Sequence, residues 1–143
     1  MNNKHALVCG SSKGIGASTA IELSKLGATI TLLARDKDSL SNILDSLDTS
    51  KKQNHNFIIA DFDDPLKLKG TIDQHVANNP TIHILINNSG GPKPGAIVDA
   101  NVEDFILAFN RHLICNHILV QAVVPKMKEA RFGRIINLSL IHI

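Results

Sequence analysis

Five short apolar segments, separated by four amphipathic ones, constrain the fold of this chain more than any other feature. The apolar segments cover residues 6–8, 29–33, 57–60, 82–86 and 135–138. Between them, apolar residues recur at the spacing of α-helices. Near-continuous apolar strands that alternate with helices are typical of a parallel sheet covered on both faces. Because crossovers are right-handed, we expect an α/β, Rossmann-like doubly wound sheet with the strand order 3-2-1-4-5.

The helical repeats of two of the four expected helices can be given residue by residue. In the first helix, helical spacing links the positions Ile15, Thr19, Leu23 and Leu26. The glycine at position 27 is expected to end that helix. The fourth expected helix is a long helical stretch from about residue 102 to residue 127. Its predicted apolar face carries Phe105, Phe109, Leu113, His117 and Val120.

Length, composition and charge exclude several classes of protein. A chain of 143 residues with 43% hydrophobic residues is long enough for one domain with a core, here residues 1–143. Its 15 Lys and Arg residues nearly balance its 13 Asp and Glu residues, so nucleic acid and membrane surfaces are not expected partners. No apolar run approaches the roughly 20 residues of a membrane span, and no signal peptide is visible. We therefore expect a cytoplasmic protein.

The cysteines and histidines do not form a recognisable metal-binding pattern. Cys9 and Cys115 are far apart in the sequence, and we expect both to be reduced and buried. No two of the seven histidines are four residues apart. His112 and His117 are five apart, which places them on different faces of a helix. The sequence therefore predicts no metal site.

A glycine-rich turn, Gly10-Ser11-Ser12-Lys13-Gly14-Ile15-Gly16, follows the first apolar segment. A strand, a tight turn and a helix start are expected here, with glycine where a side chain would obstruct the backbone. Backbone N–H groups at such a helix start favour a phosphate, most of all a dinucleotide pyrophosphate. The spacing is neither the commonest Rossmann pattern nor that of a P-loop, and a turn without any ligand remains the alternative.

Polar residues follow the other strands at the positions where those strands are expected to end. They are Arg35 after the second strand, Asp61 after the third, residues 87–90 after the fourth, and Asn137 and Ser139 at the fifth. The carboxyl ends of parallel strands meet at one edge of a sheet. We therefore expect these groups to lie together with the glycine turn, where ligands of such sheets bind.

Taken together, these motifs resemble those of the short-chain dehydrogenase/reductase family. The matching pieces are Gly10-x-x-x-Gly14-Ile15-Gly16, Asp61, Asn87-Asn88-Ser89-Gly90, Pro125-x-Met127 and Gly133-Arg134-Ile-Ile-Asn-Leu-Ser. The family usually has alanine where Ser89 stands. The resemblance covers residues 4–139, and it implies a fold whose cleft binds a nicotinamide dinucleotide.

The resemblance also implies which residues hold that cofactor. The expected contacts are Gly10, Ser12, Lys13, Gly14, Ile15, Gly16, Arg35, Asp61, Phe62, Asn87, Ser89 and Gly90. By resemblance, Asp61 accepts a hydrogen bond from the adenine amino group beside the Phe62 backbone, and Asn87 edges the adenine pocket.

NADP(H) is expected in preference to NAD(H). NAD enzymes place a carboxylate at the end of the second strand, whereas this chain has Ala34 there, followed by Arg35. In the family, basic residues at the positions of Lys13 and Arg35 bind the 2′-phosphate of NADP. The alternative is that both are solvated surface charges.

The catalytic residues that the resemblance implies are not complete in this sequence. The family uses a tyrosine and a lysine four residues later, but this chain contains no tyrosine. The family's helix asparagine falls on His112, and its catalytic serine falls on Leu140, one residue past Ser139. A shift of one residue on a strand turns a side chain to the other face, so Ser139 is a poor substitute.

Two functional hypotheses follow. The first is an NADP(H)-dependent oxidoreductase that acts on a small carbonyl or alcohol substrate, similar to 3-oxoacyl-carrier-protein reductases and homo-oligomeric in its full-length parent. The second is a nucleotide-binding fragment or pseudoenzyme without catalysis. Residues 140–143 depart from the family, which suggests a truncated copy. In that case, we expect the fifth strand to be an edge strand and the fourth helix to expose an apolar face.

Overall fold

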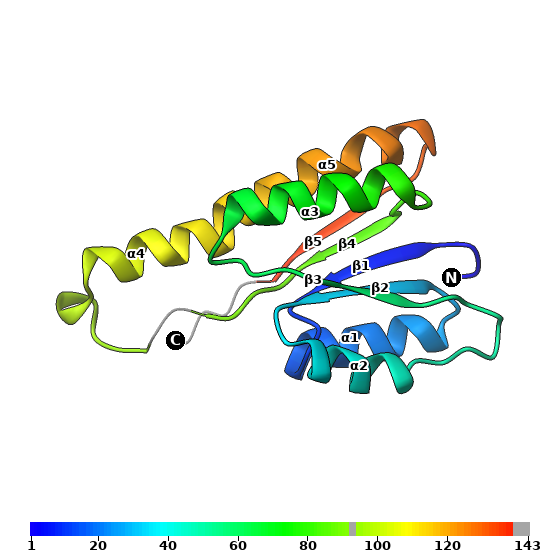
Figure 1. Cartoon of the computed structure of the whole chain (residues 1–143), viewed down its shortest axis with the longest axis horizontal. Coiled ribbons are helices and arrows are strands. Elements are labelled where there is room, and N and C mark those ends of the chain that lie inside the picture. Colours follow the sequence, from blue (N-terminus) through cyan, green and yellow to red (C-terminus); the bar gives the residue numbers. More distant parts are fainter. Residues whose placement is uncertain (92–93, 139–143) are drawn as a thin grey trace.

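The computed structural model describes residues 1–91 and 94–138 of the chain, which form a parallel sheet with helices on both faces (Figure 1). The strands are β1 (His5–Cys9), β2 (Thr29–Ala34), β3 (Asn56–Ile59), β4 (Ile84–Asn87) and β5 (Arg134–Asn137). Their order is β3-β2-β1-β4-β5, and every neighbouring pair is parallel. The predicted fold class and strand order are confirmed.

The helices divide into two layers. They are α1 (Gly14–Lys25), α2 (Lys37–Asp45), α3 (Pro65–Asn78), the 3₁₀ turn η1 (Ile97–Asp99), α4 (Val102–Phe109), the π-helical turn η2 (Asn110–Ile114) and α5 (Cys115–Glu129). In Figure 1, α1 and α2 cover one face of the sheet, and α3 and α5 cover the other. Successive residues of β1 point to opposite faces of the sheet: Leu7 packs on the α3–α5 side, and Ala6 and Val8 pack on the α1–α2 side.

The buried face of α1 is not formed by the apolar repeat that located the helix in the sequence. Ile15 and Leu26 are half-exposed, and the buried residues are Gly16, Ala17, Ala20 and Ser24. Small residues on this face let the helix backbone approach the sheet closely. A Cβ on Gly16 would lie 2.3 Å from the carbonyl oxygen of Gly10, a contact that no side chain can make. The apolar repeat therefore located the helix but not the face that it buries.

The expected long helical stretch over about residues 102–127 is present, but part of it is π-helical. The π-helical turn η2 separates α4 from α5, and α4 extends beyond the end of the sheet (Figure 1). The residues that α5 buries are Cys115, Leu119, Val123 and Met127. The predicted apolar face is exposed on α4 and η2, because Phe105, Phe109 and Leu113 are each more than half exposed.

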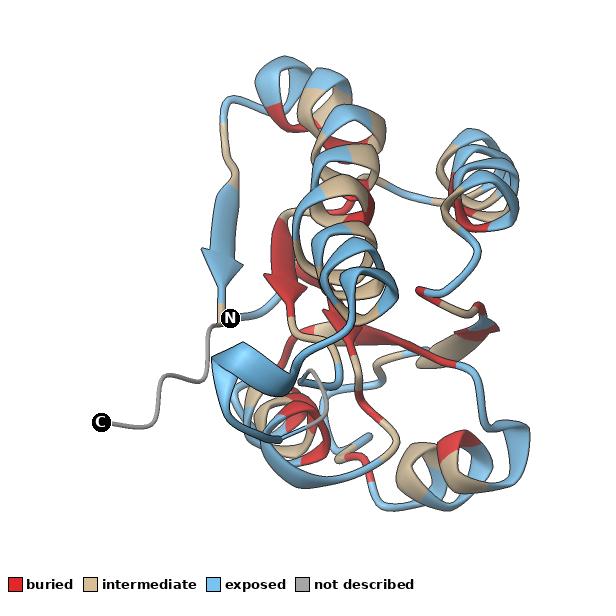
Figure 2. Ribbon diagram, turned by 90° about the vertical axis from the view of Figure 1, so that its left-hand side faces the viewer, coloured by how far each residue is buried: buried red, intermediate tan, exposed pale blue. Residues whose placement is uncertain are grey.

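Strand β5 lies at an edge of the sheet. Figure 2 shows its ribbon in the colour of exposed residues, whereas β1 and β4 are buried. Within the described residues, β5 pairs with β4 alone. Both the edge position of the fifth strand and the exposed apolar face of the fourth helical segment agree with expectation.

Candidate functional site

The glycine turn is tied to the end of β4 by Asn88. Gly10 has a φ of +58°, in the region that favours glycine, and a Cβ there would lie 2.6 Å from the Asn88 carbonyl oxygen. The Asn88 side-chain amide donates to the carbonyl oxygens of Cys9 at 3.2 Å and Gly10 at 3.4 Å. Asn88 was assigned no role of its own from the sequence beyond its place in the motif of residues 87–90, because hydrogen bonds to backbone atoms leave no pattern.

Ser11 ties the same turn to β2. Its side chain is fully buried, and its Oγ accepts a hydrogen bond from the Leu33 backbone N–H at 3.0 Å. The Ser11 backbone N–H in turn donates to the Leu33 carbonyl oxygen at 3.4 Å. The turn is therefore fixed from two neighbouring strands, although Ser11 was not among the predicted site residues.

The start of α1 differs from the starts of α2 and α3. Asp36 and Asp64 cap α2 and α3 by accepting from the backbone N–H groups of Ser39 and Lys67. The N-cap of α1 is Lys13, whose side chain has no acceptor, and the first turn of α1 has no acidic residue. The first N–H groups of α1 and the positive end of its dipole therefore remain available to an anion.

An open cleft of about 480 Å³ runs from this turn along the carboxyl ends of the strands. Its lining residues are Gly10, Ser12, Lys13, Ile15, Ala34, Arg35, Ala60, Asp61, Phe62, Asp63, Asn88, Ser89, Gly90, Gly91 and Arg111. Nine of the twelve predicted contact residues are among them, so the structure brings most of the predicted site together.

The three other predicted residues lie outside that lining. Gly14 is exposed in the turn with a φ of +57°, and Gly16 is buried beneath it. Asn87 is buried, and its Nδ2 donates to the Asn137 Oδ1 at 2.8 Å, which links β4 to β5. The Asn87 Oδ1 is buried without a hydrogen-bond partner among the described residues.

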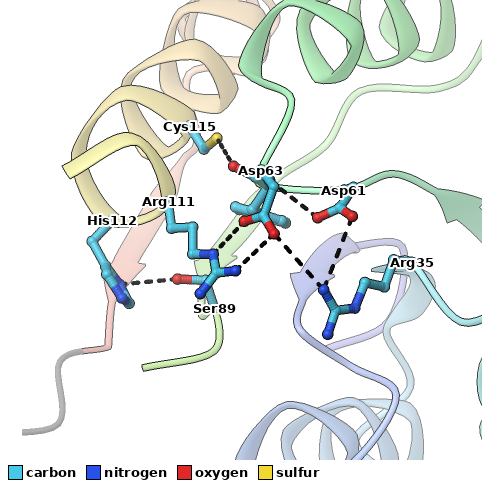
Figure 3. A network of polar contacts seen from close by, with 8 residues as sticks. Arg35, Asp61, Asp63, Ser89, Arg111, His112 and Cys115 are labelled. Carbon is cyan, nitrogen blue, oxygen red and sulfur yellow. Dashed lines mark hydrogen bonds and ion pairs between the residues drawn. The ribbon is translucent and has the colours of Figure 1, made fainter. Parts of the chain in front are cut away.

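Four charged side chains meet at the β2–β3 end of the cleft (Figure 3). Both oxygens of Asp63 accept from Arg111, whose Nη2 lies 2.7 Å from Oδ2 and whose Nε bonds Oδ1. This hydrogen bonding holds the pKa of Asp63 below its usual value and raises the pKa of Arg111. The Nη1 of Arg35 lies 4.0 Å from the Asp61 Oδ2 and 3.9 Å from the Asp63 Oδ2.

Ser89 and His112, two positions where the chain departs from the family pattern, are in contact. The Ser89 Oγ lies 2.9 Å from the His112 Nδ1, and His112 sits in the π-helical turn η2 (Figure 3). Turns of this kind occur often at functional sites. The predictions for Ser139, Leu140 and the loop at residues 92–93 lie outside the described residues.

The two cysteines are buried, as predicted, and both are thiols. Burial raises the pKa of Cys9 to about 12 and that of Cys115 to about 11. The Cys115 thiol donates to the Phe62 carbonyl oxygen at 3.3 Å. Neither group is suited to nucleophilic chemistry, because the thiolate is the reactive form.

Two further features were searched over residues 1–91 and 94–138. No cluster of three or more His, Cys, Asp or Glu side chains there could hold a metal ion. Among the same residues, no helix has the length and apolar character needed to cross a lipid bilayer.

The chain belongs to the short-chain dehydrogenase family, whose model, described as "short chain dehydrogenase", matches residues 4–142. It is 30% identical over 141 residues to a 3-oxoacyl-[acyl-carrier-protein] reductase of Rickettsia felis, covering 99% of this chain and 55% of that protein. It is 27% identical to a (2S)-[(R)-hydroxy(phenyl)methyl]succinyl-CoA dehydrogenase subunit of Thauera aromatica, with 97% of this chain and 56% of that protein covered. The chain thus spans about half the length of these relatives.

Solved structures give the same family. A metagenomic short-chain oxidoreductase in complex with NADP superposes with a TM-score of 0.87 and 26% identity, covering 99% of this chain and 64% of that one. L-Sorbose reductase from Gluconobacter frateurii, complexed with NADPH and L-sorbose, gives a TM-score of 0.85 at 27% identity, covering 94% of this chain and 51% of that one.

Proposed function

We propose that the cleft binds a nicotinamide dinucleotide, with NADP(H) preferred over NAD(H). The observation that carries this proposal is the arrangement of the cleft itself. The cleft contains the uncapped start of α1 with its glycine turn. It also contains Arg35, next to Ala34, where NAD enzymes have a carboxylate. The glycines fit a closely approaching phosphate, and two of the similar structures are described as complexes with NADP or NADPH.

Each wall of the cleft has a separate part in holding the cofactor. The N–H groups at the start of α1 would hold the pyrophosphate, and Lys13 and Arg35 the 2′-phosphate. The Asp61 carboxylate would accept from the adenine amino group beside Phe62, while Ser89 and Gly90 would line the route toward the nicotinamide. When bound, the cofactor supplies or accepts a hydride. A carbonyl or alcohol of small size, as in 3-oxoacyl-carrier-protein reductases, is the substrate class that we propose for the whole protein.

For these 143 residues alone, we propose cofactor binding without turnover. General acid–base help is worth about 10²- to 10⁴-fold in rate, and no tyrosine is present to give it. Incubating the purified chain with NADPH and a panel of ketones would show no oxidation of NADPH above the blank. Measurable turnover would favour an active enzyme over a binding module.

Cofactor preference can be tested on Arg35. Two charge-assisted hydrogen bonds of about 1.5–3 kcal/mol each favour NADPH over NADH by on the order of 100-fold. We expect Arg35→Ala to weaken NADPH binding by about tenfold or more and to leave NADH binding nearly unchanged, as measured by enhancement of nicotinamide fluorescence. Lys128→Ala, which removes an exposed charge on α5 outside the cleft lining, is the matched control. Equal losses for both cofactors would contradict the assignment.

A further inference from the structure

We propose that Arg111 is a positioning residue that sets the preference for a 2′-phosphate by neutralising Asp63 and so leaving Arg35 available to the phosphate. This inference rests on the proposed function, namely that the cleft binds NADP(H). Arg111 was not among the predicted site residues, and it lies 48 positions from Asp63 in the sequence.

Asp63 lies between two arginines that come from different walls of the cleft. Figure 3 shows Arg111 approaching from the η2 turn and Arg35 from the end of β2. Asp63 follows Asp61 in the segment between β3 and α3. The four side chains carry two positive and two negative charges, so this end of the cleft is electrically balanced.

Arg111 holds Asp63 far more firmly than Arg35 does. Two nitrogens of Arg111 bond the two carboxylate oxygens, the fork geometry in which arginine pairs best with a carboxylate. The Arg111 side chain is 22% exposed, whereas that of Arg35 is 69% exposed. The Arg35 distances of 3.9 and 4.0 Å exceed hydrogen-bond length. Among the described residues, no acceptor holds the Arg35 guanidinium in a hydrogen bond.

Loss of the Arg111 charge would change what Arg35 faces. Asp63 would then present an unpaired carboxylate to Arg35 and compete for it, next to that of Asp61. The same carboxylate would repel a 2′-phosphate, which carries up to two negative charges. NADH has an uncharged hydroxyl at that position, which a carboxylate does not repel, so its affinity should not fall. Arg111 should therefore affect the ratio of the two affinities, and not only their common level.

A purely structural role for Arg111 makes a different prediction. If the Arg111–Asp63 pair only braces the walls of the cleft, breaking the pair from either side should weaken NADPH and NADH alike. The charge role instead makes the two single substitutions opposite in sign. Removing Arg111 lowers the NADPH preference, and removing the Asp63 charge raises it, because the Arg111 charge is then unpaired.

The experiment measures dissociation constants for NADPH and NADH, by fluorescence, in the complete 143-residue chain. We expect Arg111→Met to lower the NADPH preference about tenfold, since charges a few ångströms apart near a surface interact by about 1 kcal/mol or more. Arg111→Lys, which keeps the charge, should stay within about threefold of wild type. The double variant Arg111→Met, Asp63→Asn should regain the wild-type preference to within about threefold, because the unpaired carboxylate is gone.

Equal loss of both cofactors in Arg111→Met, or a double variant that stays as poor as the single one, would overturn the inference. If Arg111→Met does not fold, Asp63→Asn decides alone, because a raised NADPH preference supports the charge role and an unchanged or lowered one contradicts it. A wild-type chain that prefers NADPH while Arg111→Met keeps the ratio refutes this inference and spares the proposed function. A wild-type chain without any NADPH preference overturns both.

Discussion

At the scale of single residues, the site depends on backbone positions that only glycine can occupy and on side chains that hold them in place by hydrogen bonds. Gly10 has a positive φ and lies against the Asn88 carbonyl, while Ser11 and Asn88 bond the turn to β2 and β4. The turn is held in shape by the protein and not by the ligand. It therefore meets a phosphate without first having to become ordered.

The substitution Gly10→Ala tests whether the shape of the turn is constrained, because it adds a single carbon atom. The added Cβ would clash with the Asn88 carbonyl at 2.6 Å in a strained backbone conformation. We expect it to lower the free energy of unfolding by about 2 kcal/mol or more, measured by urea denaturation, and to weaken NADPH binding. Gly70→Ala is the control, because Gly70 lies within α3 with no atom near the new Cβ. That change should stabilise the chain by about 0.5–1 kcal/mol. A Gly10→Ala variant as stable as wild type would show that the turn is not constrained.

Much of the site could be read from the sequence, because the ends of parallel strands meet at one edge whatever the details of packing. Arg35, Asp61 and Ser89 lie in one cleft for that reason. The Asp63–Arg111 pair could not be predicted, since its members are far apart in sequence and Arg111 lies in the π-helical turn, whose altered phase decides where its side chain points. Asn88 was missed because its bonds go to backbone atoms, which leave no pattern.

At the scale of elements, the helical segment from α4 to α5 has two parts that pack differently. α5 packs on the sheet through Leu119 and Val123, whereas α4 buries no residue at all within the described part of the chain. Its periodicity is that of an amphipathic helix, but the apolar side faces outward. Sequence periodicity shows that an apolar face exists without showing what covers it. We expect this exposed apolar face to make copies of the chain associate in solution.

Substitutions on the two helices should separate these roles. We expect the double change Phe105→Gln, Phe109→Gln to leave the free energy of unfolding within about 0.5 kcal/mol of wild type, because both side chains are more than half exposed. It should also lower the average mass in sedimentation. Leu119→Ala, in the core, should cost about 2–5 kcal/mol. A wild-type chain that sediments as a clean monomer would contradict the association that we expect for α4.

At the scale of the whole molecule, the proposed cofactor cleft and a group of histidines around the buried His5 lie at opposite ends of the sheet. His5 begins β1, and its Nε2 lies 2.7 Å from the Thr31 Oγ1. The His5 backbone N–H donates to the His83 Nδ1 at 3.2 Å. Burial, and then the nearby His75 and His83, lower the pKa of His5 to about 4. The cluster therefore couples folding to pH far from the cofactor cleft.

Stability should fall as the pH falls from about 6.5 to 4. The unfolded chain takes up the His5 proton near pH 6.5, whereas the folded chain resists it down to about 4, so protons favour unfolding within that window. The His5 contribution is fully present above pH 6.5, and its loss amounts to about 3 kcal/mol at the acid end. Urea denaturation at several pH values would show that the free energy of unfolding of His5→Gln depends less steeply on pH than that of wild type. At pH 7.5, the difference in stability between wild type and His5→Gln measures any loss of packing. An equally steep pH dependence in the two proteins would contradict the lowered pKa of His5.

The most direct measurement for the central claim is the mapping of NADPH binding on the isotope-labelled chain by NMR. We expect saturable shifts of the backbone amides in the Gly10–Gly16 turn, at Arg35, and at the residues after β3 and β4. The amides of His5 and His83, at the far end of the sheet, should not move. Absence of any saturable shift, or shifts confined to residues outside the cleft, would contradict the claim that this cleft binds the cofactor.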